Sequence, residues 1–358
     1  MPTIFILLTY YWLITFSIIG YGILFNNFFL KNTNNIGFIG IYGIFSLTLL
    51  SYLINFFLPH TESINVVILS IGLINFLVSI KKDLIKKNIN LLLIVFTILI
   101  LFILTAKNHD DFSYYHFPYI HLLTEYPNMI GLGNFNHGFR THSSIFYLTT
   151  LFNLPFSNFY LFNLSPVFFM GFANIILYKR ISSYLDQTKT TYLLYLSLFS
   201  LIFINIFFYR LGEHGTDRSA MILIFILTIE LLHLINQKRN VDQNFFLRPV
   251  ILITLIISLK TFYILYCLLF IPVIWYFKKK NISLIFFFQK SVSYVCLGMI
   301  LSLLTVNFFN SGCLLYPVKF TCFESFSWSI PLNEVEAMNN WYQQWAKAGA
   351  NPNFRVEN

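Results

Sequence analysis

The stretch KNHDDFSYYHFPYIHLL, residues 107–123, brings carboxyl, imidazole and phenol groups together. Asp110, Asp111, Tyr115 and His116 lie close to one another within it. A carboxylate can take a proton from an attacking hydroxyl, and an adjacent imidazole can orient that carboxylate or the hydroxyl. These residue types therefore indicate general acid–base chemistry, with Asp111 as the candidate base.

Four further polar residues could add charge stabilisation to that chemistry. Arg140 and His142 lie in GFRTHSS, Asp217 in GEHGTDRS, and Lys260 in SLK. Cations stabilise the charge that develops on a departing phosphate. Carboxylates placed with arginine, histidine and lysine at one membrane surface would suit an enzyme whose leaving group is a phosphate.

Each group also has a plain structural explanation. Asp111 could cap a helix, as aspartates commonly do. The aromatics that follow it recur at helical spacing and could form an amphipathic helix in the membrane interface. Arg140 and Asp217 could be solvated loop charges. The sequence alone does not decide between these readings and the catalytic one.

The elements that must position these residues are membrane helices. Hydrophobic residues make up 57% of the chain, charged residues 10%, and the mean hydropathy is +0.69. Apolar runs long enough to cross a bilayer recur along the whole sequence. They lie at about 3–29, 36–58, 62–80, 89–106, 144–178 (broken near Leu154-Pro155), 191–209, 219–236, 249–277 and 290–308. We expect an all-α polytopic membrane protein whose first run is a membrane helix, not a removable signal peptide.

The charges of the linkers predict the orientation. Basic linkers lie at 81–87, 179–189, 236–248 and 278–281. The positive-inside rule places these in the cytoplasm and the N-terminus, segment 107–143, loop 210–218 and the tail outside. The composition, rich in Ile, Phe, Asn and Lys, suggests an AT-rich bacterial genome, hence the bacterial cytoplasmic membrane. No basic patch with interleaved aromatics indicates a nucleic-acid partner.

The run 249–277 is too long for one crossing and too short for two full ones, at roughly 43 Å of helix. It predicts a re-entrant hairpin of two short helices entering from the cytoplasm, with Lys260 near its tip. A single tilted helix is the alternative. The expected organisation is a transmembrane domain over 1–308, with about eight full spans besides the hairpin, and an extracytoplasmic tail over 309–358.

The cysteines predict a possible disulfide, and the common motifs of soluble enzymes are not found. Cys313 and Cys322 both lie in the tail, nine positions apart, and a disulfide between them is plausible if that compartment is oxidising. The sequence contains no G-x-x-x-x-G-K-[ST] loop, G-x-S-x-G elbow, H-E-x-x-H or C-x-x-C pair. Metal-ligand spacing is not visible either.

The order of these pieces resembles the GT-C class of membrane glycosyltransferases, which take sugar from a polyprenyl-phosphate donor. More closely, the chain is similar to a family of uncharacterised bacterial multipass proteins related to that class. The resemblance covers 107–347. It is carried by DFSYYH, EYPNMIGLGNFNHGFRTHSS, GTDRSA, SLK, NSGCLLYPVKFTCF and WSIP…NNWYQQWAK.

The sequence departs from the family pattern at three points. Arg140 is displaced from the usual arginine position, and His142 stands where the family has asparagine. Asp110 is an additional carboxylate beside the matched Asp111. The chain also stops soon after WAK, whereas such proteins commonly continue into further membrane helices, so the tail could be truncated.

The resemblance implies a GT-C-like helix bundle with an outward amphipathic helix. It implies transfer of a sugar from a polyprenyl-phosphate donor to a lipid or cell-envelope glycan at the outer face. Asp111 would be the general base, with His116 orienting it or the acceptor. Lys260 and Arg140 would hold the donor phosphate, and Asp217 would bind acceptor hydroxyls or a metal. Asp110, Tyr115 and His142 complete the expected substrate-binding set. Participation of Mg²⁺ or Mn²⁺ and the oligomeric state stay open.

Three other functions remain. A polysaccharide polymerase or ligase acts on a glycan carried by a diphosphate lipid and would be expected to have arginine-rich outer loops. Only four arginines are placed outside here, which slightly disfavours this function: Arg140, Arg210, Arg218 and Arg355. A transporter of lipid-linked glycans would show repeats or charges deep in several spans, and only Glu230 and Lys260 fit. A non-enzymatic assembly protein would tolerate the loss of every outward carboxylate.

Overall fold

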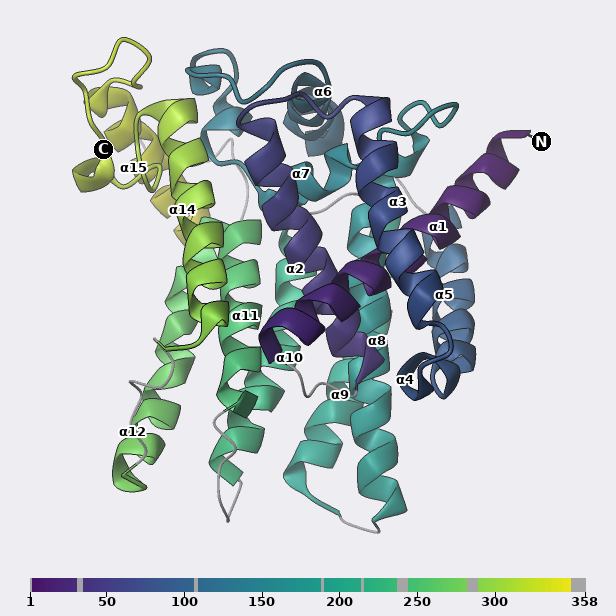
Figure 1. The fold of residues 1–358 in the computed structure, drawn as a ribbon. Coiled ribbons are helices and arrows are strands. Elements are labelled where there is room, and N and C mark those ends of the chain that lie inside the picture. The colour runs from purple at the N-terminus through teal and green to yellow at the C-terminus, as the bar shows by residue number, and fades with distance from the viewer. Residues whose placement is uncertain are drawn as a thin grey trace.

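The computed structural model describes residues 2–30, 35–105, 109–187, 190–213, 216–236, 244–281 and 289–348. Every regular element within these ranges is a helix (Figure 1). The α-helices are α1 (Pro2–Phe25), α2 (Ile36–Asn55), α3 (Glu62–Ser79), α4 (Asp83–Lys86), α5 (Ile89–Leu104), α6 (Phe117–Glu125), α7 (Ser144–Thr150), α8 (Ser165–Asp186), α9 (Tyr192–Phe207), α10 (Thr216–Asn236), α11 (Asn244–Leu259), α12 (Ile271–Lys279), α14 (Ser291–Ser311) and α15 (Leu332–Ala348). Short 3₁₀ or π turns join or extend them: η1 (Asn26–Leu30), η2 (Phe112–His116), η3 (Leu132–Asn134), η4 (His137–Arg140), η5 (Tyr160–Leu164), η6 (Leu211–Glu213), η7 (Thr261–Phe270) and η8 (Lys319–Thr321).

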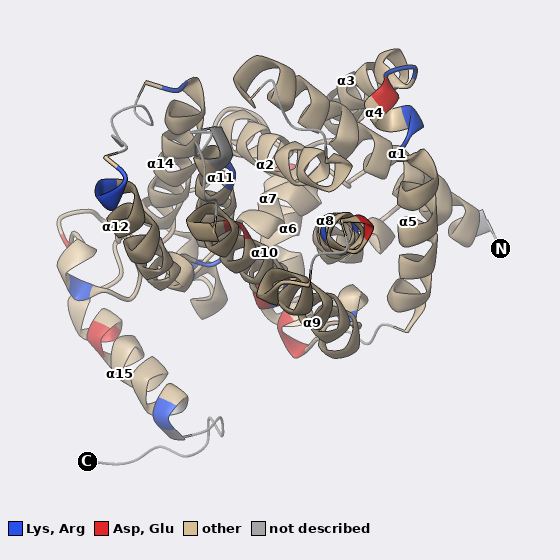
Figure 2. Cartoon of the chain, turned by 90° about the horizontal axis from the view of Figure 1, so that it is seen from below, with Lys and Arg blue, Asp and Glu red and all other residues tan. Residues whose placement is uncertain are grey.

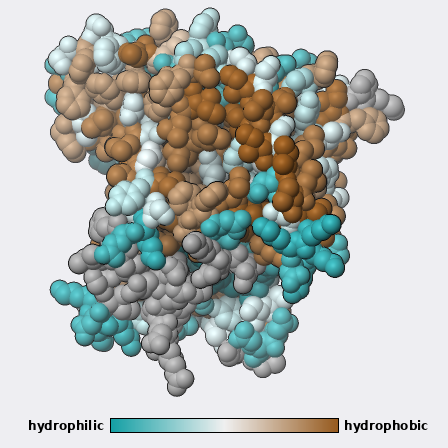
Figure 3. Space-filling model, viewed as in Figure 1, coloured by the Kyte–Doolittle hydropathy of each residue, from teal (hydrophilic) through white to brown (hydrophobic). Residues whose placement is uncertain are grey.

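Seven helices in the described part of the chain are long and apolar enough to cross a membrane. They are 3–30, 36–55, 62–79, 160–186, 216–236, 261–279 and 291–311. This confirms an α-helical polytopic membrane protein. The helices α5 and α9 are apolar but have only 16 residues each, about 24 Å, which is less than the ~30 Å hydrocarbon core. Figure 3 shows hydrophobic residues spread over α1 and α3, with hydrophilic residues below at α4.

The basic linkers 81–87 and 278–281 and the described part of 179–189 lie toward one end of the bundle, whereas most of 236–248 lies outside the described residues. Figures 1 and 2 place α4, the end of α8 and the end of α12 toward this end, with lysines coloured on α4 and at α12. We call it the basic end. The opposite end carries α6, α15, the start of α10 and the turn after α11, and it contains both acidic and basic residues. We call it the mixed-charge end.

Close helix packing forms the core. A Cβ on Gly20 of α1 would lie 1.8 Å from the carbonyl oxygen of Gly72 on α3, so the two backbones approach as only small residues allow. Of the seven spans, the one that ends in α8 is the most deeply buried. Figure 2 shows α8 surrounded by the other helices. The expected break near Leu154-Pro155 is confirmed, since α7 ends at Thr150 and the next span begins at Tyr160.

The chain reverses direction at Lys260. Phe246, near the start of α11, contacts Phe270 and Phe277 with ring centroids 5.9 and 5.3 Å apart, so α11 and the η7–α12 limb run antiparallel. Lys260 has an extended backbone (φ −156°, ψ 116°) between the limbs. The expected turn near Lys260 is therefore present. The two limbs are not both short, however, because α11 begins at Asn244 rather than at 249 and the limb Thr261–Lys279 is long enough to cross a membrane. The re-entrant character of the hairpin stays a prediction.

Candidate functional site

Asp111 lies at the start of the helical segment formed by η2 and α6. Its side chain is 46% exposed and its carboxylate lies 3.5 Å from Nδ1 of His109. The side chain does not cap the helix. The charge of this carboxylate lies near the phenol of Tyr115, and after burial it is the largest cause that raises the pKa of Tyr115. The capping explanation for Asp111 is thus wrong, and the carboxylate is accessible beside a phenol.

The aromatic stripe that follows Asp111 turns partly inward. Tyr119 is fully buried, and its ring lies 5.3 Å from that of Phe139 and 5.4 Å from that of Phe146. Tyr126, at the end of the stripe, is exposed. The segment is therefore fixed against α7 by its aromatic face. This packing holds Asp111 and Tyr115 in a defined position at the mixed-charge end.

Tyr115 connects two carboxylates. Burial, and then the nearby charges of Asp111 and Asp217, raise the pKa of Tyr115, so its phenol stays protonated and acts as a donor. Gly138 makes room for its ring, because a Cβ on Gly138 would lie 2.3 Å from Cγ of Tyr115. Asn136 holds the two segments together by donating its side-chain amide to the Tyr114 carbonyl at 3.0 Å.

Asp217 and Lys260 form an ion pair at the same place. Asp217 is in the first turn of α10, and Nζ of Lys260 lies 2.7 Å from Oδ1 and 2.8 Å from Oδ2 of its carboxylate. The two side chains are 43% and 45% exposed, respectively. The turn at Lys260 thus delivers a cation to the neighbourhood of Tyr115. Two carboxylates, a protonated phenol and an ammonium group meet here from three separate elements.

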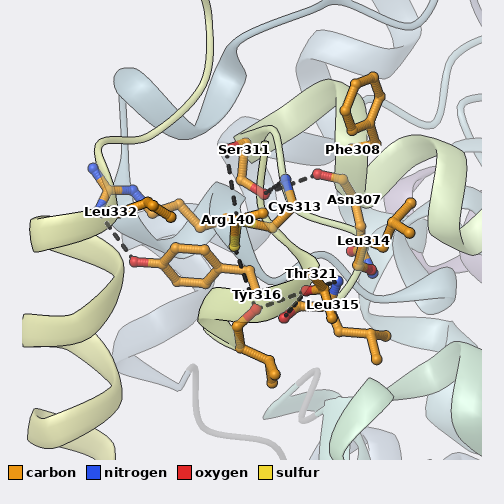
Figure 4. The surroundings of a disulfide bond; sticks show 12 residues. Arg140, Asn307, Phe308, Ser311, Cys313, Leu314, Leu315, Tyr316, Thr321 and Leu332 are labelled. Carbon is orange, nitrogen blue, oxygen red and sulfur yellow. Dashed lines mark hydrogen bonds between the residues drawn. A yellow bond between two sulfur atoms is a disulfide. The ribbon is translucent and has the colours of Figure 1, made fainter. Parts of the chain in front are cut away.

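Arg140 is placed differently from the expected phosphate ligand. Only 6% of the residue is exposed. Its Nε donates to the carbonyl of Gly133 at 2.8 Å, one terminal nitrogen to the Tyr316 hydroxyl at 3.2 Å, and the other to the Glu334 carboxylate at 3.0 Å. Figure 4 shows its side chain extended toward Tyr316. Arg140 therefore joins the 133–140 region to the C-terminal segment.

The two expected histidines lie on the buried side of the site. His116 packs between the ring of Tyr115, 4.3 Å away, and that of Phe146, 5.2 Å away. His142 is buried, lies 3.0 Å from the Tyr52 hydroxyl through Nε2, and has its pKa lowered by burial to about 3. The neutral His142 therefore holds its region against α2 through the contact with Tyr52. Asp110 is exposed, and its backbone carbonyl accepts a hydrogen bond from Ser113.

The C-terminal segment contacts the region around the site through Tyr316 and Glu334, which both bond to Arg140. Burial, followed by the nearby Tyr316, raises the pKa of Tyr342 on α15. The Cys313–Cys322 disulfide, left open by the sequence, is present and lies beside Tyr316 (Figure 4). His109, whose imidazole lies beside Asp111, was not assigned a role from the sequence.

One comparison with known proteins gave a match, which covers nearly the whole chain. Residues 4–355 match a family model described as a domain of unknown function, DUF8201. The chain belongs to the DUF8201 family. Comparison with curated proteins gave no match, and neither did comparison with solved structures. Every site residue from Asp111 to Lys260 lies inside the DUF8201 region, so the site belongs to the family domain and not to an appendage.

Other polar groups lie in the loop before α10, at the mixed-charge end. A terminal nitrogen of Arg218 donates to the Arg210 carbonyl within the loop before α10. His214 lies outside the described residues. Among those that are described, no three His, Cys, Asp or Glu side chains lie together as ligands of one metal ion would.

Proposed function

We propose that this DUF8201 protein is a membrane glycosyltransferase that moves a sugar from a polyprenyl-phosphate donor to a lipid or cell-envelope glycan. The observation that carries the proposal is the meeting of Asp111, Tyr115, Asp217 and Lys260 at one end of a membrane helix bundle. A base and a cation placed together are what attack by a hydroxyl with loss of a phosphate requires. The GT-C-like architecture and a re-entrant role for the Lys260 hairpin are part of this proposal.

Asp111 is the general base of the proposed reaction. Its carboxylate takes the proton of the acceptor hydroxyl, whose oxygen bonds to the anomeric carbon of the donor sugar. The bond between that carbon and the phosphate oxygen breaks, and its electron pair leaves with the phosphate. Lys260 stabilises the leaving phosphate by exchanging its contact with Asp217 for one with the phosphate. Asp217, once released, accepts hydrogen bonds from acceptor hydroxyls.

Arg140 acts indirectly in this proposal. Because all three of its guanidinium nitrogens have partners, it serves to fix the C-terminal segment rather than to hold the donor phosphate. His116 and His142 likewise support the site from the buried side. Lys260, at the turn of the hairpin, is then the cation that contacts the donor phosphate.

The distribution of charge supports an outer-face location. The positive-inside rule assigns the basic end to the cytoplasm and the site to the outer face of the bacterial cytoplasmic membrane. A half-exposed cluster at a bundle end avoids the cost of about 2.5–3.5 kcal/mol that an isolated charge would carry at mid-membrane. The apolar surface between the two ends provides the lipid-facing wall that a polyprenyl chain requires.

Mass spectrometry of envelope glycolipids and glycans tests the proposal. Four strains are compared: a deletion, and the deletion restored with wild type, Asp111→Asn or Asp110→Asn at equal membrane level. We expect one glycosylated species to disappear in the deletion and return with wild type and with Asp110→Asn. It should stay absent with Asp111→Asn, because the charge of Asp111, and not that of Asp110, acts on the phenol of Tyr115.

The outcomes separate the alternatives. Full restoration by Asp111→Asn removes the base from the mechanism and favours transport or assembly. An unchanged profile in the deletion would argue against any transferase activity. Loss of polymer length with retention of the monomeric unit would indicate a polymerase or ligase instead.

A further inference from the structure

A groove of about 420 Å³ lies at the basic end, between the last two turns of α8 and the start of α5. Its polar wall contains Lys179, Ser182, Ser183 and Asp186. These four residues follow one another at the i, i+3, i+4 and i+7 spacing that places side chains on one face of a helix. Leu91 of α5 forms the apolar side of the groove. The groove is therefore distinct from the Asp111 site, which lies at the opposite end of the bundle.

Lys179 provides a cation that is available to a ligand. The residue is half-buried, and within the described ranges it makes no hydrogen bond and no ion pair. The next residue, Arg180, is committed to the Glu230 carboxylate inside the bundle. An ammonium group that is partly removed from water without a counter-ion has lost hydration that nothing replaces. A bound anion would supply the missing partner.

Two hydroxyl groups lie between Lys179 and the carboxylate at the end of the helix. Ser182 donates to the Asp186 carboxylate at 3.4 Å, and the side-chain amide of Gln187 donates to the Ser183 hydroxyl oxygen, also at 3.4 Å. Both hydrogen bonds are long and therefore weak, so a ligand can replace them at small cost. An ammonium group with hydroxyl donors suits a phosphate, whereas the Asp186 carboxylate suits a cation.

The apolar side of the groove continues into the surface of the membrane domain. Leu91, Ile94, Ile98 and Leu101 share one face of α5, and the last three are 59%, 51% and 61% exposed. Figure 1 shows that the end of α8 reaches farther toward the basic end than the start of α5. The polar wall thus lies at the end of an exposed apolar stripe. A ligand with a charged headgroup and acyl chains can occupy both surfaces at once.

We propose that this groove binds a membrane phospholipid whose headgroup carries a phosphate and a primary ammonium group, as phosphatidylethanolamine does. Lys179 and Ser183 bind the phosphate, Asp186 binds the ammonium group, and an acyl chain lies along the stripe from Leu91 to Leu101. Basic pockets between membrane helices on the cytoplasmic side are suited to lipid headgroups. The lipid connects the short helix α5 to α8, and its binding does not depend on the proposed glycosyl transfer.

Native mass spectrometry of the delipidated full chain in detergent tests the role of Lys179. The protein is titrated with phosphatidylethanolamine and, separately, with phosphatidylglycerol, which has the phosphate without the ammonium group. We expect tighter binding of phosphatidylethanolamine to the wild type. Lys179→Met should raise its apparent Kd about 10-fold, because a charge-assisted contact is lost. Lys86→Met removes an exposed lysine of α4 at the same end, and should change Kd by less than about 2-fold.

Two further variants separate the loss of specific contacts from a loss of folding. Lys179→Arg keeps the charge and should bind the lipid within about 3-fold of the wild type. Asp186→Asn removes the partner of the ammonium group, so the preference for phosphatidylethanolamine over phosphatidylglycerol should disappear. Equal effects of Lys179→Met and Lys86→Met, or equally poor binding by Lys179→Arg and Lys179→Met, would overturn the proposal. Retention of the headgroup preference in Asp186→Asn would overturn it as well.

A competition experiment distinguishes a lipid from a soluble ligand with the same headgroup. Free phosphoethanolamine carries both charges but has no acyl chain to place along the stripe on α5. We expect it to leave phosphatidylethanolamine bound when the two are present at equal concentration. Displacement of the lipid under these conditions would show that the groove binds a soluble phosphate compound, and the proposal would be wrong.

Discussion

Two ion pairs in this molecule differ in how much water surrounds them. Lys260 and Asp217, at the mixed-charge end, have side chains that are 45% and 43% exposed. Arg180 of α8 and Glu230 of α10 are 13% and 3% exposed and lie within the bundle. An exposed pair contributes about 0–1 kcal/mol to stability, whereas breaking a buried one leaves a charge without compensation.

The difference separates a structural pair from one that is available for chemistry. Arg180 and Glu230 join two central helices, and the Glu230 carboxylate in particular is almost completely shielded from solvent. Lys260 and Asp217 lie where a ligand can replace either partner at small cost. The weak contribution of the Lys260–Asp217 pair to stability is consistent with a role in binding. The following measurements test the contrast between the two pairs.

The largest loss of stability is expected from Glu230→Gln. The substitution leaves Arg180 charged and buried, which should cost about 3–5 kcal/mol of unfolding free energy. Denaturant titration of the detergent-solubilised protein measures it. A double variant, Arg180→Met with Glu230→Gln, removes the uncompensated charge and should recover most of the loss. Equal stability of wild type and Glu230→Gln would remove the contrast between the two pairs.

Acidification should weaken the protein through its buried neutral histidines. Burial lowers the pKa of His142 to about 3 and that of His60 to about 4, from an ordinary value of 6.5. The unfolded chain then binds protons that the folded one does not. Stability is therefore complete above about pH 6.5 and falls below it, by up to about 1.4 kcal/mol per pH unit for each histidine. Thermal midpoints between pH 7.5 and 5 measure the slope, which should be shallower in His142→Gln.

Gly138→Ala should disturb the site through packing alone. The added Cβ would lie 2.3 Å from Cγ of Tyr115, and overpacking of this kind costs about 1–3 kcal/mol. Tyr115 must shift, so product formation should fall as well. The matched control is Gly298→Ala on α14, where the added Cβ meets nothing within 4 Å. Thermal midpoints and product yields of the two variants are compared, and equal values would show that Tyr115 is not held by Gly138.

The smallest change in stability is expected from Asp217→Asn. Its partner Lys260 is 45% exposed and remains solvated, so the unfolding free energy should change by less than about 1 kcal/mol. The glycosylated species should nevertheless be lost, since the acceptor loses a charged ligand. A strongly destabilised Asp217→Asn variant would show that the Lys260–Asp217 pair is structural, like the Arg180–Glu230 pair. A stable and fully active variant would exclude Asp217 from binding.

Long-period patterns in the sequence predicted the membrane architecture well. Six of the eight runs predicted as full spans contain helices long enough to cross a membrane, whereas 89–106 and 191–209 contain helices of only 16 residues. The excessive length of 249–277 placed the turn at Lys260. These features depend on hydropathy and charge summed over many residues. The half-exposed Asp111 was also identified from its neighbours, because polar groups are rare in this chain.

Side-chain partnerships could not be predicted in the same way. Arg140 resembled a phosphate ligand until Glu334, 194 positions later, was found on its guanidinium group. His142 resembled a substrate ligand, but Tyr52 of α2 holds it in the core. The docking of α15 gave no signal either, since it arises from the packing of Val335 and from the contact between Arg140 and Glu334. Such contacts join residues that local sequence does not relate.

The reversal at Lys260 also constrains how this part of the chain enters the bilayer. Both limbs of the hairpin run from the basic end toward the turn at Lys260. If the two ends of the bundle lie on opposite sides of a bilayer, Lys260 has to cross the hydrocarbon during insertion to reach Asp217. Carrying one charge to mid-membrane costs about 2.5–3.5 kcal/mol, and the apolar η7–α12 limb would offset this cost if the two limbs entered together.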